Sequence, residues 1–418
     1  MDKLPIFTTK KEKIVAFSLL LLIFLINLSW QYKKYLNFTQ KPFFYTTAEV
    51  IYSHTKSKNG RRYQILKLKT KDDKTVYIST LKHDNFQNSI LRLKLYTQSK
   101  IKISFWDYLK GFYIYSKILD SKIQKPSIKD KIDSLIHSQH KNSQFGSLFS
   151  AIFLATPLQS DIRERMTLFG INHLVALSGF HLGILSGIIF FIMIPIYRFL
   201  QRRFFPWRDR NFDLGIVVFC FLFFYIYFVD FPPSLVRSYV MMLFSWVALL
   251  FWLKLVSFEF LAIVVTSILA MIPEMIVSLS FWLSVAGVFY IFLILRHIQD
   301  KRVLILILPL LIHLLMIPIA HSIFDEVSPY QWLSPILSWI FIIFYPLSLL
   351  LHILGLGGVL DFLLDYLWRV PLEFNHKLLP IPLLFTYILF SLLAIRLRLF
   401  FWVLVTFALG VGVYLYLF

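Results

Sequence analysis

Residues 170–183 read Gly-Ile-Asn-His-Leu-Val-Ala-Leu-Ser-Gly-Phe-His-Leu-Gly and open an apolar run that continues to Pro195. Two histidines, an asparagine, a serine and three glycines are unusual residues for so hydrophobic a segment. Polar side chains at membrane depth normally face a bundle interior or a wet cavity, because an unpaired polar group in hydrocarbon is costly. The stretch therefore predicts a membrane protein with a hydrophilic feature inside its helices.

The composition of the whole chain supports a polytopic membrane protein. Of its 418 residues, 58% are hydrophobic and 16% are charged, and the mean hydropathy is +0.68. Soluble domains carry about 25% charged residues. The lone cysteine, Cys220, excludes an intramolecular disulfide and a cysteine-based zinc site.

Apolar runs long enough to span a membrane follow residue 147 almost without interruption. An earlier run from Ile14 to Trp30 follows a lysine-rich start and lacks a small-residue cleavage motif, so residues 1–30 are expected to be a retained anchor. Residues 147–158 are too short to span and are expected to be re-entrant or interfacial. The other expected spans are 171–197, 213–229, 236–253, 256–272, 279–295, 303–320, 332–353, 379–395 and 399–417.

Residues 31–120 have a different pattern, in which apolar and polar residues alternate with a period of two. Such runs predict short strands, and about five strands in this length favour a small antiparallel barrel with an OB-fold as the leading candidate. The following residues, 121–146, have amphipathic spacing and are expected to form a surface helix that connects to a transmembrane domain at 147–418. The strand-like runs lie at 47–52, 62–68, 75–78 and 100–105.

The soluble stretch between residues 31 and 145 holds 23 basic and 8 acidic residues, a net charge of +15 within a chain total of +20. Clustered cations bind phosphates, and aromatic faces between them stack on the bases of single strands. A lysine-rich solvated surface is the alternative interpretation. The candidate DNA-binding residues are Lys58, Arg61, Arg62, Tyr63, Lys67, Lys69, Lys100, Lys102 and Trp106.

Arginine and lysine in short loops indicate which side of each span faces the cytoplasm. The arginine-rich loop 198–210 is expected inside, together with the N-terminal lysines, which places residues 31–146 outside. Strict alternation then puts Arg396 and Arg398 outside, against the rule. The conflict is removed if 332–353, which contains Pro335 and Pro346, is a re-entrant pair rather than a span.

The polar segment allows three interpretations. Its glycines recur every four residues, which suits close helix contact, and they also suit a break that exposes polar groups to an aqueous path. Ser178 and His181 are spaced for a nucleophile and base, but a serine hydrolase also needs an orienting carboxylate, and none is evident. The candidate channel-lining residues are Asn172, His173, Ser178, Gly179, His181, Gly183 and Arg237.

Arg237 enters an apolar span directly after Pro232 and Pro233. An arginine beneath a membrane surface is costly unless it is paired or hydrated. A pore for a polyanion has a reason to place a cation there, and snorkelling to the interface is the alternative.

Residues 170–183 resemble the central signature of the ComEC family of competence proteins. Residues 231–241, 281–288 and 105–113 resemble three further family segments in the same order: Phe-Pro-Pro-Ser-Leu-Val-Arg-Ser-Tyr-Val-Met, Phe-Trp-Leu-Ser-Val-Ala-Gly-Val and Phe-Trp-Asp-Tyr-Leu-Lys-Gly-Phe-Tyr. The resemblance implies a channel that carries transforming DNA across the inner membrane as a single strand. The metallo-β-lactamase-like domain of many family members has no counterpart in this sequence.

The sequence thus predicts a polytopic α-helical inner-membrane protein with a small extracytoplasmic OB-like β-barrel domain. An intramembrane hydrolase and a scaffold that recruits the channel are the alternative functions. No motif predicts a cofactor, a metal site or a P-loop ATPase. The partners that the family resemblance implies are DNA, a cytoplasmic helicase or translocase, an extracytoplasmic DNA receptor and a separate nuclease. Membrane lipids surround the spans, and homo-oligomerisation is left open.

Overall fold

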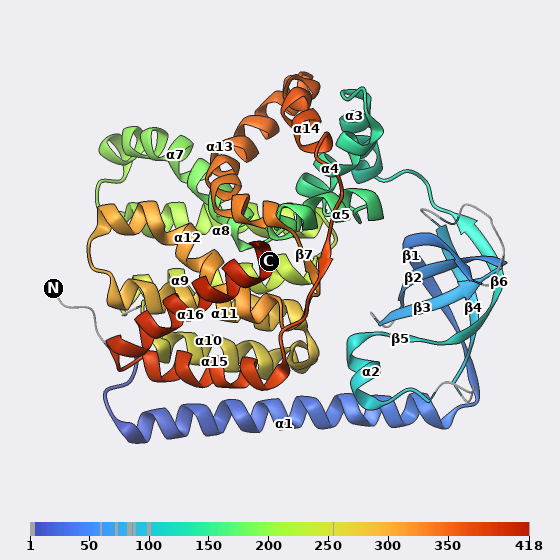
Figure 1. Cartoon of the computed structure of the whole chain (residues 1–418), viewed down its shortest axis with the longest axis horizontal. Helices are drawn as coiled ribbons and strands as arrows, with labels where there is room; N and C mark the ends of the chain where they lie inside the picture. The colour runs from blue at the N-terminus through green and yellow to red at the C-terminus, as the bar shows by residue number, and fades with distance from the viewer. Residues whose placement is uncertain are drawn as a thin grey trace. The chain divides into compact units, whose positions relative to one another are not determined.

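The computed structural model describes residues 5–58, 61–71, 74–81, 86, 89–97, 102–253 and 255–417 (Figure 1). The chain forms two compact units. The β unit comprises Phe7–Lys131 and Val265–Leu279, and the helical unit comprises Met1–Ile6, Ile132–Val264 and Ser280–Phe418.

The β unit begins with a long helix and continues into a strongly paired sheet. Thr9 caps α1, with its side chain accepting from the Glu12 backbone and the Glu12 side chain accepting from the cap in return. The elements are α1 (Lys10–Gln40), β1 (Phe43–Lys58), β2 (Arg61–Thr70), β3 (Thr75–Thr80), β4 (Ser89–Tyr96), α2 (Phe105–Lys110), β5 (Phe112–Tyr113) and β6 (Tyr115–Ile123).

The strand order is β5-β3-β2-β1-β4-β6, with all neighbours antiparallel except the parallel pair β3 and β5. Only Ile114, a buried residue, separates β5 from β6. β5 and β6 are therefore consecutive in the chain although they lie at the two ends of the strand order. This arrangement agrees with the expected small β domain, and its assignment as an OB-fold stays a prediction.

Two local predictions for the β unit are wrong. The expected strand at 100–105 does not form over the described residues 102–105, because Ser104 and Asp107 make a capping box that starts α2 at Phe105. The anchor helix does not end at Trp30. It continues to Gln40, since Tyr35 and Phe38 pack against the core of the sheet.

The helical unit contains two hydrophobic cores. One is built from α4 to α9 with α13 and α14, and the other from α11, α12, α15 and α16, which lie side by side in Figure 1. The helices after the β unit are α3 (Ile128–Ser138), α4 (Ser143–Leu154), α5 (Ser160–Leu168), α6 (Asn172–Val175), α7 (Gly179–Phe204), α8 (Arg210–Phe228), α9 (Pro233–Leu250), α10 (Phe258–Met271), α11 (Leu279–His297), α12 (Lys301–Ala320), α13 (Ser334–Ile353), α14 (Asp361–Trp368), α15 (Ile381–Ala394) and α16 (Arg398–Leu417). Shorter elements are η1 (Pro273–Val277), β7 (Glu326–Val327), η2 (Pro329–Leu333), η3 (Gly357–Leu360) and β8 (Asn375–His376).

Among the described residues, 8 helices are long and apolar enough to cross a membrane. They confirm the predicted fold class, a polytopic helical membrane protein with a small β domain near the N-terminus. The spans are Lys10–Gln40, Gly179–Phe204, Arg210–Phe228, Pro233–Leu250, Leu279–His297, Arg302–Ala320, Pro329–Ile353 and Arg398–Leu417, and α4, α10 and α15 are shorter apolar helices.

The segment before α13 and the segment after α14 pair with each other. β7 pairs with β8, and the Leu379 backbone amide donates to the carbonyl of His321 at 2.9 Å. The segment from α13 to α14 therefore leaves and returns on the same side of the helical unit. The expected re-entrant pair within 332–353 is wrong, because α13 is one continuous helix despite Pro346. The return passes instead through η3 and α14.

Candidate functional site

The polar segment at 170–183 is broken in the middle rather than being one helix. α6 ends at Val175, and Ser178 caps α7 by accepting from the Phe180 amide at 3.3 Å. The expected span at 171–197 therefore starts only at Gly179. A serine hydroxyl competes well for backbone donors at a helix start, which explains the break. It leaves helix-terminal backbone groups between two apolar segments.

Helix α9 packs against this break through two serines. The Ser234 hydroxyl donates to the Leu177 carbonyl at 2.7 Å. A Cβ atom at Gly179 would lie 3.0 Å from the Ser238 oxygen, so glycine permits the close approach there. Apart from chain neighbours and the helix's own backbone, no atom of the described residues lies within 4 Å of a Cβ placed at Gly183 or Gly187. Of these three glycines, Gly179 therefore shows the predicted small-residue contact.

Arg237 lies on α9 between these serines and is buried, with 6% of its surface exposed. Its guanidinium donates to the Ser280 hydroxyl at 3.0 Å and to the Ser280 carbonyl at 3.2 Å, which ties α9 to the start of α11. Within the described chain it has no carboxylate partner, and its Nε has no hydrogen bond. A side chain that turns inward in this way does not snorkel to a membrane surface.

His181 is fully buried between the rings of Phe341 and Tyr345, at centroid distances of 5.3 and 4.8 Å. Its Nδ1 accepts from the Ser178 amide at 3.3 Å, which leaves the proton on Nε2. Its Nε2 has no hydrogen-bond partner among the described residues. No carboxylate is among the described contacts of His181, so the orienting acid of a serine hydrolase is not found there.

His173, at the start of α6, is an exposed histidine in the helical unit. His181 on α7 and His313 on α12 lie within electrostatic reach of it. Three imidazoles from three helices are therefore grouped near the break in the polar segment. We call these three residues the histidine site.

The loop that leads into α6 and His173 is anchored from η2 and α13. Asn172 is exposed and donates to the Thr167 hydroxyl at 2.7 Å. Ser334 donates to the Gly170 carbonyl at 3.0 Å, and Gln331 donates to the Thr167 carbonyl at 3.1 Å. Gly170 has a φ of +65°, which favours glycine at this turn. These bonds fix the position of His173 at the start of α6.

Three sequence stretches, 170–183, 231–241 and the start of α11, therefore converge on one polar region. Residues 156–417 match the Competence protein family. The chain belongs to this family, the family of ComEC. No curated protein and no solved structure matches the chain. Membership gives this Competence family protein a role in DNA uptake during natural competence.

The predicted DNA-binding residues of the Competence family protein are only partly grouped. Arg62, Tyr63, Lys67 and Lys69 all lie on β2, and the exposed Trp106 lies on α2 with Lys102 just before it. Lys100 lies outside the described residues, as do the side chains of Lys58 and Arg61.

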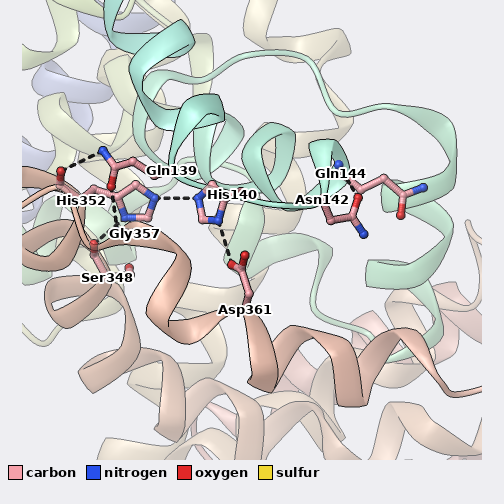
Figure 2. Close-up of polar contacts among 8 residues, drawn as sticks. All are labelled: Gln139, His140, Asn142, Gln144, Ser348, His352, Gly357 and Asp361. Carbon is pink, nitrogen blue, oxygen red and sulfur yellow. Dashed lines mark hydrogen bonds and ion pairs between the residues drawn. The ribbon is translucent and has the colours of Figure 1, made fainter.

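Sequence reasoning missed a buried polar network between the α3–α4 junction and the return segment (Figure 2). His140, whose side chain is 0% exposed, lies 2.8 Å from Asp361 through Nδ1 and 3.0 Å from His352 Nε2 through its own Nε2. His352 Nδ1 lies 2.7 Å from the Ser348 carbonyl. The His140 ring also stacks on Phe149 at 4.8 Å.

The contacts of this network join two parts of the helical unit. The Ser348 carbonyl can only accept, so His352 carries a proton on Nδ1. His140 bridges the other two contacts and links His352 to the Asp361 carboxylate. The network therefore ties the α3–α4 junction to the return segment.

We expect His140→Phe to destabilise the Competence family protein by about 3 kcal/mol, since it keeps the stacking on Phe149 but leaves a partly buried carboxylate unpaired. Asp361→Asn is the control. Its amide can donate to His140, so the expected loss is about 1 kcal/mol or less. The free energy of unfolding of the purified protein in detergent measures both, and equal losses would contradict the network.

Proposed function

We propose that this protein is the inner-membrane channel that imports one strand of transforming DNA. The observation that carries the proposal is the histidine site, where the exposed His173 lies within electrostatic reach of His181 and His313. Imidazoles give phosphates and bases polar partners at membrane depth. Arg237 adds a buried cation without an acid partner among the described residues, as the path of a polyanion requires.

The pairing of β7 with β8 supports an orientation with the β unit outside. When the α13–α14 segment returns to the side from which it left, α15 runs inward and Arg396 and Arg398 fall inside, together with the loop 198–210. Within the β unit, Lys74 contacts Glu274 of η1 at 2.6 Å, which places the loop after α10 on the side of the sheet. The same assignment puts residue 417 outside.

We assign the energy for transport and the degradation of the second strand to partner proteins. We propose that a cytoplasmic helicase or translocase pulls the strand, that an extracytoplasmic receptor delivers the DNA and that a separate nuclease removes the other strand. The sequence contains no P-loop motif, and the described residues contain no group of side chains suited to a metal ion.

Entry of fluorescent double-stranded DNA into single cells tests the proposal. In a strain with an in-frame deletion of the gene, we expect DNA to collect outside the cytoplasm and never enter it, and wild-type protein to restore entry. Unchanged cytoplasmic entry in the deletion strain would contradict the channel. Complementation with Ser178→Thr separates the hydrolase alternative, because threonine keeps the helix cap but is a poor substitute for a serine nucleophile. The channel predicts entry with this variant.

A further inference from the structure

The outward face of three neighbouring strands in the β unit carries a row of aromatic and basic side chains. In one cross-strand row Phe43 of β1 lies opposite Tyr96 of β4, which lies opposite Tyr115 of β6. In the next row Tyr45 lies opposite Lys94, which lies opposite Lys117. We call these six residues the aromatic platform.

The platform residues point away from the barrel core because the strands alternate. On β4 the side chains of Leu91, Leu93 and Leu95 are buried, so Lys94 and Tyr96 face the other way. Tyr45 is 59% exposed and Tyr115 is 64% exposed. Large rings on an open sheet face remain available for contact with a ligand.

The side-chain ammonium group of Lys94 lies among these rings. Its Nζ lies 3.8 Å from the centroid of Phe43, 5.3 Å from that of Tyr96 and 5.8 Å from that of Tyr45. These contacts order the rings and the ammonium together. A ligand with flat rings and negative charges at short spacing satisfies both groups.

We propose that the aromatic platform binds single-stranded DNA by stacking bases on Tyr45 and Tyr115 and by pairing phosphates with Lys94 and Lys117. Single-strand sites combine a basic track with aromatic faces, and bases in a duplex are not free to stack in this way. The net charge of +15 over residues 31–145 complements a polyanion. This proposal deepens the proposed function, on which it rests, by assigning the external contact to β1, β4 and β6 rather than to β2.

Binding of a fluorescein-labelled deoxythymidine oligonucleotide to the full-length protein in lipid nanodiscs tests the platform. We expect Tyr45→Ala and Tyr115→Ala each to weaken binding about tenfold, since one stacked base is lost, while Tyr45→Phe keeps the ring and the affinity. Lys94→Gln should lower the slope of log affinity against log salt by about 0.7, because one phosphate contact is lost. Lys125→Gln, which removes an exposed lysine after β6, is the matched charge control and should leave affinity and slope nearly unchanged.

Three results would overturn the proposal. The first is an unchanged oligonucleotide affinity in the two alanine variants, and the second is an equal affinity for a duplex of the same length. The third is that the alanine variants lose binding to anionic vesicles while they keep their binding to DNA. The last result would identify a lipid surface as the occupant. The assay also separates this proposal from the channel. If the platform variants bind the oligonucleotide weakly while DNA still enters the deletion strain normally, the channel proposal is contradicted and the platform proposal stands.

Discussion

Arg237→Met is expected to reduce transformation about a thousandfold, because a phosphate and a cation about 4 Å apart attract by roughly 4 kcal/mol at an effective dielectric of about 20. The same variant should fold at least as well as the wild type. A buried guanidinium without an acid partner is costly, and its two hydrogen bonds to Ser280 offset only part of that cost. Methionine fills similar space without a charge.

Transformation frequency and the unfolding temperature in detergent measure the two effects on the same variant. Arg237→Lys retains the charge but not the two-pronged contact with Ser280, so an intermediate frequency is expected. Arg302→Met removes an exposed arginine and should leave both quantities unchanged. A strongly lowered unfolding temperature for Arg237→Met, with normal transformation, would make Arg237 a structural residue.

The second prediction with a large expected effect concerns the access of water to position 173. The chain has one cysteine, so Cys220→Ala gives a background without thiols. In that background His173→Cys is expected to react quickly with a membrane-impermeant maleimide added from outside, because an exposed position that water reaches allows the thiolate to form. Phe191→Cys in the expected span α7 should stay unlabelled, since an apolar side chain that is 81% exposed on such a span is expected to face lipid.

Much of the fold was predictable because hydropathy is a strong signal over a whole span. The runs at 213–229, 303–320 and 399–417 correspond to α8, α12 and α16 within a few residues. Two elements that the strand prediction did not include, β4 and α2, had signals that were present in the sequence. Leu91, Leu93 and Leu95 alternate with polar residues and mark β4, and the Ser104–Asp107 spacing marks the cap of α2.

The sequence predicted which segment holds the candidate site, but not how its residues are arranged. Polarity within an apolar run identified His173 and Ser178, but no periodicity reveals that Ser178 ends one helix and begins another. The His140–His352–Asp361 network joins residues more than 200 positions apart, at sequence separations of 212 and 221. Register likewise decides which rings share a sheet face with Lys94, and alternation alone does not set it.

The labelling rate of the thiol in His173→Cys, measured while cells take up DNA, tests most directly whether a strand passes the histidine site. The account predicts fast labelling in resting cells and slow labelling during uptake, when the strand covers position 173. Lys125→Cys, at an exposed position of the β unit, reports that the reagent itself still reaches the cells. If position 173 stays unlabelled while position 125 reacts, or if its labelling rate does not change with DNA, the claim that the strand passes His173 is wrong.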